Sequence, residues 1–366
     1  MDVLFGLKRE HMNDEIVPHV VSSLLQTLPL MAPNLEKFSC EIDIRLGHEY
    51  LEAFSHLARL KTLTIHSEDA LDESALRILS AIATLQDLTC TIDRSSSSAL
   101  TLRPHTFPHL TSLNVLGRFD DLTTVIGASN LPSLKGLTLR VKEPPGAGKP
   151  VDSFAAICRR CNPALLTSFT VGIKFAFTAN WPRPSRLLEY FEPVLAFPNI
   201  KSFHLSFFYA RPSIHDDDLA RCGAAWRSLS RFHVSHTLLG QDAPGPRDPE
   251  FARPTLSGLV DLARRCPHLE TFRVPELDVN VVPDTSAALP IGHGLQTFWL
   301  EDVVLPAPES TLYREAATVF DRVFPSIDLN DARSIMSHAK EWGEFLGVLD
   351  GMRLGRAALE VADVLA

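Results

Sequence analysis

A six-residue pattern recurs along this chain of 366 residues. It consists of Leu, two variable residues, Leu or Phe, one variable residue and an aliphatic residue, as in LETFRV (269–274). Its first position falls on Leu35, Leu60, Leu85, Leu110, Leu134, Leu166, Ile200, Leu229, Leu269 and Leu295. The first three intervals are 25 residues and the fourth is 24, which chance apolar content does not produce. Such a period predicts one supersecondary unit repeated along the chain.

The composition of each repeat indicates a strand followed by a helix. In LETFRV the apolar Phe272 and Val274 alternate with polar residues, which is the period of a half-buried strand. Between the patterns, segments such as LDESALRILSAIATL (71–85) carry apolar residues at helical spacing. One such unit cannot bury its own apolar face, so neighbouring units must stack. We therefore expect an α/β solenoid, with a curved parallel β-sheet on the concave side and helices on the convex side.

The pattern also divides the chain. Residues 1–34, with the apolar segment VPHVVSSLLQTLPLM, predict an N-terminal helical cap, and residues 35–305 predict the solenoid of about ten repeats. Residues 306–366 predict a degenerate last repeat, FPSIDL at 324–329, and a helical C-terminal cap. The Pro/Gly-rich segments 141–150 and 240–254, and the segment 177–186, predict exposed loops.

These repeats resemble the leucine-rich repeats of ribonuclease-inhibitor-like proteins. Phe in the second anchor position and the closing FPSIDL segment are similar to fungal F-box/leucine-rich-repeat proteins in particular. That resemblance implies an α/β leucine-rich-repeat solenoid, and an F-box that docks the adaptor of a cullin-type ubiquitin ligase. The chain departs from the family here, because no segment before Leu35 has the L-P-x-E-like opening of an F-box.

The net charge of −9 disfavours nucleic-acid and anionic-membrane partners, because both require a basic surface. The first fifteen residues do not read as a signal peptide, and no apolar run reaches the length of a membrane span. The six cysteines and the absence of an N-x-Ser/Thr sequon favour a cytoplasmic or nuclear location. We expect a monomer without cofactors.

Three motifs suggest chemistry but are better explained by structure. The CRRC motif (158–161) has the spacing of a redox or zinc site, but the chain has no second such pair. The segments LARRC (262–266) and LARC (219–222) also end in Cys just before a repeat, and we interpret all three cysteine positions as equivalent helix ends. We expect all six cysteines to be free and mostly buried. PPGAGKP (144–150) lacks the Ser or Thr of a phosphate-binding loop. HDDD (215–218) predicts a helix start, because consecutive Asp residues cap free N–H groups there.

His204 and His233 occupy outward positions on consecutive strands, with Ser206 and Ser235 two residues further on. Parallel strands lie about 4.8 Å apart, so the two imidazoles should be neighbours. A Ser/His site, a two-His metal site, a partner-binding surface and solvated strand residues are all compatible with this pattern. Catalysis or metal binding would require a third group, which the same row lacks.

The outward row changes in character along the chain. Its members are Ser39, Thr64, Thr89, Asn114, Thr138, Thr170, His204, His233, Arg273 and Trp299. Small polar residues thus give way to aromatic and cationic ones, which carry a large share of interface energy. We expect a partner to bind at His204, Arg231, His233, Arg273, Trp299 and Glu301. The alternative for Trp299 is that the C-terminal cap shields it.

The sequence therefore predicts a non-enzymatic protein–protein interaction scaffold, with no catalytic or metal-binding residues and a protein partner of unknown identity. The alternative is the substrate-recognition subunit of a cullin-type ubiquitin ligase whose F-box is missing from this chain.

Overall fold

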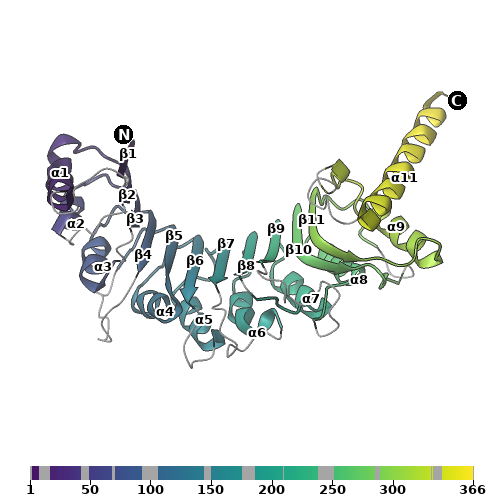
Figure 1. Ribbon diagram of the computed structural model, residues 1–366, viewed down its shortest axis with the longest axis horizontal. Helices are drawn as coiled ribbons and strands as arrows, with labels where there is room; N and C mark the ends of the chain where they lie inside the picture. Colours follow the sequence, from purple (N-terminus) through teal and green to yellow (C-terminus); the bar gives the residue numbers. More distant parts are fainter. Residues whose placement is uncertain are drawn as a thin grey trace. The chain divides into compact units, whose positions relative to one another are not determined.

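The computed structural model describes residues 2–7, 17–42, 49–67, 71–92, 106–143, 150–174, 186–208, 210–237, 251–284, 289–330, 332 and 340–365. The chain forms two compact units, Met1–Ala176 and Phe177–Ala366, a division that the sequence analysis does not predict. Both are α/β units in which parallel strands alternate with helices (Figure 1). Among the described residues, no helix combines the length and apolarity needed to cross a membrane.

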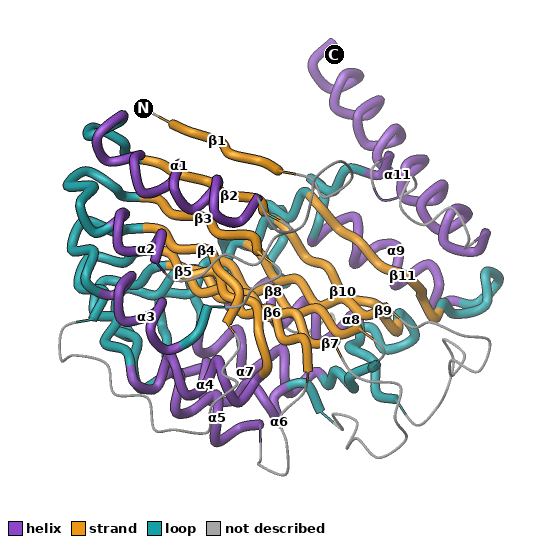
Figure 2. The backbone as a smooth tube through the Cα atoms, turned by 60° about the vertical axis from the view of Figure 1, so that its left-hand side comes forward, coloured by secondary structure: helices purple, strands orange, loops and turns teal. Residues whose placement is uncertain are grey.

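The first unit contains a sheet whose neighbouring strands all pair in parallel and in chain order (Figure 2). Its strands are β1 (Asp2–Leu7), β2 (Lys37–Ile42), β3 (Thr62–Ser67), β4 (Asp87–Ile92), β5 (Ser112–Arg118), β6 (Gly136–Glu143) and β7 (Ser168–Lys174). Its helices are α1 (Val17–Met31), α2 (Glu49–Phe54), α3 (Glu73–Ser80), α4 (Phe119–Ala128) and α5 (Pro150–Cys158). Figure 1 shows these helices against one face of the sheet, which leaves the other face open.

The second unit has the same parallel order. Its strands are β8 (Ser202–Phe208), β9 (Arg231–Thr237), β10 (Thr271–Asp278) and β11 (Thr297–Val304). Its helical elements are α6 (Leu188–Phe191), the 3-10 helix η2 (Glu192–Ala196), α7 (Asp216–Ala225), α8 (Leu256–Arg265), α9 (Thr311–Val323) and α11 (Lys340–Leu365). In each unit, we call the sheet face opposite the helices the open face.

The recurring pattern places the strands. In each of the ten patterns, a strand begins two residues after the first position, as β3 does at Thr62 after Leu60. All ten first-position side chains are at most 1% exposed. The next residue of the pattern donates its backbone N–H to the same position of the preceding repeat within a unit, for example Gln86 to Lys61 at 2.7 Å and Glu270 to Ser230 at 2.8 Å. The repeat therefore encodes a turn that sets each strand beside the preceding one.

The degenerate segment 324–329 keeps this turn but not the strand. The N–H of Asp328 donates to the carbonyl of Gln296 at 3.0 Å, the bond made by the other repeats, and Ile327 is buried. A helical turn begins at Leu329 where a strand would start. Trp342 and Phe345 of α11 pack against Phe320 of α9 and close the core at this end.

The cysteine prediction is confirmed, with one correction. All six thiols are free, and all are buried except the half-buried Cys158. Burial raises the pKa of Cys90 to about 12, so the thiol stays protonated and unreactive at neutral pH. Cys266 follows α8 as its C-cap, but the equivalent residue after α7 is Trp226, so the equivalence assumed for Cys222 is wrong.

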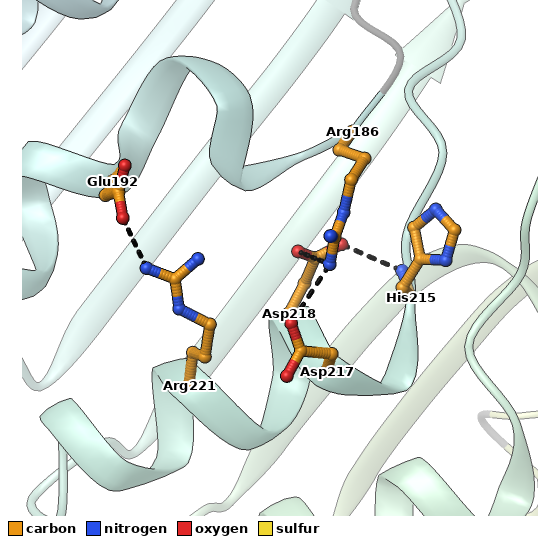
Figure 3. Close-up of polar contacts among 6 residues, drawn as sticks. All are labelled: Arg186, Glu192, His215, Asp217, Asp218 and Arg221. Carbon is orange, nitrogen blue, oxygen red and sulfur yellow. Dashed lines mark hydrogen bonds and ion pairs between the residues drawn. The ribbon is translucent and has the colours of Figure 1, made fainter.

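The HDDD segment begins α7, as predicted. Figure 3 shows Asp218, which is buried and accepts the backbone N–H of His215 at 2.9 Å while its other oxygen accepts from Arg186 at 3.0 Å. Arg186 also contacts Asp217 at 3.1 Å. Asp216 instead accepts from the N–H and hydroxyl of Thr255, at 2.7 and 2.6 Å, and so joins α7 to the start of α8. The acidic run therefore orders the helix layer.

Several predicted boundaries shift. The helix in 71–85 covers only Glu73–Ser80, although Ile82 and Leu85 after it are buried as expected. Strand β1 lies in the segment predicted as a helical cap, while α1 matches the predicted helix at 17–31. Of the predicted loops, 144–149, 177–185 and 240–250 lie outside the described residues, and with them most of PPGAGKP. Residues 141–143 belong to β6, and Pro254 is buried rather than exposed.

Candidate functional site

The outward row of the second unit is held from behind by a column of phenylalanines. Phe203, Phe232, Phe272 and Phe298 are in register on β8 to β11, and neighbouring ring centroids lie 5.6, 5.6 and 6.1 Å apart. Each is at most 2% exposed. Because side chains alternate along a strand, the next residue of each strand points to the open face. His204, His233, Arg273 and Trp299 are therefore in register there, as the sequence predicts.

His204 and His233 stack on each other. Their ring centroids lie 3.9 Å apart and the planes differ by 11°. Burial lowers the pKa of His233 to about 3, and the neighbouring His204 and Arg273 add to this effect. Burial and Arg273 also lower the pKa of His204. Both imidazoles are therefore neutral at pH 7, which removes the repulsion that two charged rings would suffer at this distance.

Two serine hydroxyls join the histidine pair. Nε2 of His204 lies 3.0 Å from Oγ of Ser206, which lies 2.9 Å from Oγ of Ser235. The Ser/His contact considered from the sequence therefore exists. No described carboxylate contacts His204, however, and no group of three metal-ligating side chains occurs among the described residues. A histidine with a lowered pKa is also a weak general base.

Arg273 and Trp299 form the other half of the row. The guanidinium carbon lies 3.5 Å from the centroid of the indole, within the range of a cation–π contact. Burial lowers the pKa of Arg273, an effect that the nearby Glu301 opposes. Trp299 is half-buried, so part of its side chain stays accessible. Nε of Arg273 is buried and has no hydrogen-bond partner among the described residues.

Glu301 and Arg231 complete the predicted set. Oε2 of Glu301 lies 3.6 Å from Nδ1 of His236, which sequence reasoning missed. Burial raises the pKa of Glu301 to about 7, and the pKa of His236 falls to about 4 through burial and the charge of Arg211. Arg231 lies two residues before His233 on the same face and is exposed. All six predicted residues thus lie on the open face of one unit.

Beside this row lies a buried ionic cluster that sequence reasoning missed. Glu276 on β10 accepts hydrogen bonds from Arg211 and, at 2.5 Å, from Arg253. Arg211 is 4% exposed and Glu276 is 6% exposed. The arginines come from two copies of one phrase, YARPS (209–213) and FARPT (251–255), a repeat that could have revealed them. The pocket lined by Arg211, Arg253 and Glu276 has a volume of about 10 Å³ and holds one water at most, so it has no room for a ligand.

The open face of the first unit differs in its central row, as predicted. Its central row from Ser39 to Thr170 is in register and consists of small polar residues. Further along β6 and β7, however, Arg140, Lys142 and Lys174 are exposed on the same side. The flanking positions of the first unit therefore carry cations, although its central row does not.

Comparison with protein-family models gives no match, and comparison with curated proteins gives none either.

Proposed function

We propose that the chain is a non-enzymatic leucine-rich-repeat protein that binds a protein partner on the open face of its second unit. The proposal is supported mainly by the row His204, His233, Arg273 and Trp299, which a column of buried phenylalanines holds in register. Large side chains on a rigid sheet lose little entropy on binding, so they suit an interface. The backbone hydrogen bond that recurs at the turns within each unit, and the intervals of 25 and 24 residues from Leu35 to Leu134, support the repeat family.

An enzymatic role has less support. His204 and Ser206 are in contact, but a nucleophilic serine requires a basic histidine that a third group orients. The lowered pKa of His204 opposes that role. We therefore expect the purified chain to show no turnover of generic ester and peptide substrates, and we expect replacement of His204 with Ala to change nothing in these assays. Turnover that survives purification and disappears in this variant would contradict the proposal.

The experiment that tests partner binding compares substitutions on the two open faces. Affinity purification from the native organism, followed by mass spectrometry, supplies captured partners. Arg273→Ala and Trp299→Ala should weaken capture of the same partner by tenfold or more, whereas Thr89→Ala and Thr138→Ala should have little effect. Circular dichroism would confirm that all four variants fold. Equal effects of the two pairs would contradict this assignment of the interface.

The second candidate function is substrate recognition within a cullin-type ubiquitin ligase, supported by the resemblance of the Phe-containing repeats to fungal F-box proteins. We expect that this chain alone does not retain the cullin adaptor, because no segment before Leu35 has the L-P-x-E-like opening of an F-box. Pull-down of the purified adaptor tests the point. Retention of the adaptor by this chain would favour the ligase role.

A further inference from the structure

Arg273 is the half-buried arginine of the second open face, whereas Arg231 on the same face is exposed. The side chain of Arg273 makes no ion pair or hydrogen bond among the described residues, and its Nε is buried. Nearby Arg211 and Arg253, in contrast, both contact Glu276. Burying an unpaired charge costs free energy, so stability alone does not account for Arg273.

The indole of Trp299 fixes the plane of this guanidinium. One face of the group lies against the ring at 3.5 Å, and the buried Nε leaves the two terminal nitrogens as the donors that a partner can reach. A planar fork of two N–H groups matches the two oxygens of a carboxylate. Because the orientation is set before binding, a ligand does not bear the cost of ordering this side chain.

The surroundings favour a ligand with a single negative charge. His204 and His233 are neutral, and Ser206 and Ser235 are uncharged donors. On β8 to β11 the exposed or half-exposed charged residues are Arg231, Arg273, Asp278, Glu301 and Asp302, and Arg231, Arg273 and Glu301 belong to the central and flanking rows described above. Within these two rows the two arginines outnumber the one carboxylate, although the net charge of the chain is −9, so the rows can attract an acidic segment.

We propose that Arg273, positioned by Trp299, binds an aspartate or glutamate side chain of an acidic segment in the partner. This rests on the proposed function, whose interface it refines. A phosphorylated segment fits less well, because a phosphate dianion calls for several cations, whereas Arg211 and Arg253 are engaged by Glu276 and Glu301 adds a carboxylate to this face.

The test uses the full chain and an array of twelve-residue peptides of random sequence, with binding measured in solution by fluorescence anisotropy. Bound peptides should be enriched in Asp or Glu. Changing the selected acid to its amide should weaken binding by about tenfold to a hundredfold, as expected for a charge-assisted pair of hydrogen bonds. A phosphoserine at that position should not improve affinity over the carboxylate.

Protein variants identify the group responsible. Arg273→Gln should remove the preference for acid over amide, and Arg273→Lys, which keeps the charge, should retain only part of it. Trp299→Leu should weaken the preference because the fork loses its fixed plane. Arg140→Gln is the matched control, because it removes one exposed arginine from the open face of the first unit. Thermal unfolding would establish that each variant folds.

The outcomes separate this inference from the proposed function. Peptides that bind to the second unit with equal affinity for acid and amide would overturn the inference while supporting the interface. A stronger response to phosphoserine would replace carboxylate recognition with phosphate recognition. Equal losses from Arg140→Gln and Arg273→Gln would show diffuse attraction instead of a site. Failure of every acidic peptide to bind at millimolar concentration would overturn the inference, while partner capture that depends on Trp299 would still support the interface.

Discussion

The guanidinium carbon of Arg273 lies 3.5 Å from the centroid of the Trp299 ring, and no carboxylate pairs with it among the described residues. The pair joins the two chemical features most common at binding hot spots, an aromatic surface and a cation. Its position in register beyond the His204–His233 stack follows from the parallel ladder and the buried phenylalanines behind it. The open face of the second unit therefore combines a rigid support with a charge whose pairing is incomplete.

Arg273 should be dispensable for stability, in contrast to Arg253. Replacing Arg273 with Met removes an unpaired charge and one cation–π contact, so the free energy of unfolding should change by less than about 1 kcal/mol. Arg253→Met instead removes one of the two arginines that contact the buried Glu276, and should cost about 2 kcal/mol or more. Chemical denaturation of both variants measures the difference. A larger loss for Arg273→Met would assign this residue to the structural network.

The stacked histidines should destabilise the protein in acid. The pKa of His233 is about 3 in the folded chain against an ordinary 6.5, so below pH 6.5 the unfolded chain takes up a proton that the folded chain refuses. The stability contributed by this group is therefore lost as the pH falls below about 6.5. His233→Gln should reduce the fall in melting temperature between pH 7 and pH 5. An unchanged pH profile would show that His233 is accessible to protons.

Glu301 should act in the opposite direction. Its pKa of about 7 exceeds the ordinary 4.5, so the folded chain holds a proton between these values that the unfolded chain has released. Stability contributed by Glu301 is therefore present at low pH and is lost as the pH rises through 7. The groups around it are Arg273, Glu276 and the neutral His236. The difference in melting temperature between the wild type and Glu301→Gln, measured from pH 5 to 8, isolates the contribution of Glu301 to stability. The histidines are present in both proteins, so their contributions cancel in the difference. A constant difference would contradict the raised pKa.

The sequence predicts the strands well because each repeat marks its strand by two features, the alternation of apolar and polar residues and the buried first position of the pattern, which serves as an anchor. The position of every strand from β2 to β11 follows from that anchor. Strand β1 carries no such anchor, and only its pairing with β2 reveals it. Likewise, the outward row follows from period and alternation, whereas the meeting of Arg211, Arg253 and Glu276 depends on segments outside the repeat. Such tertiary contacts leave a weak trace in one sequence, here the duplicated ARP phrase.

The contact between α7 and α8 should tolerate no side chain at Gly258. A Cβ atom there would lie 2.1 Å from Oδ1 of Asp216 and 3.0 Å from its Cβ. The carboxylate cannot move aside without losing its hydrogen bonds to the N–H and hydroxyl of Thr255, at 2.7 and 2.6 Å. Gly258→Ala should therefore lower the free energy of unfolding by about 1–3 kcal/mol, the usual cost of overpacking.

Gly347→Ala is the matched control, because a Cβ at this position of α11 meets nothing within 4 Å. It should stabilise the helix by up to about 1 kcal/mol, since Ala is the better helix former. Chemical denaturation of the two variants measures both effects, and a neutral Gly258→Ala would show that α7 and α8 are less tightly joined than this contact requires.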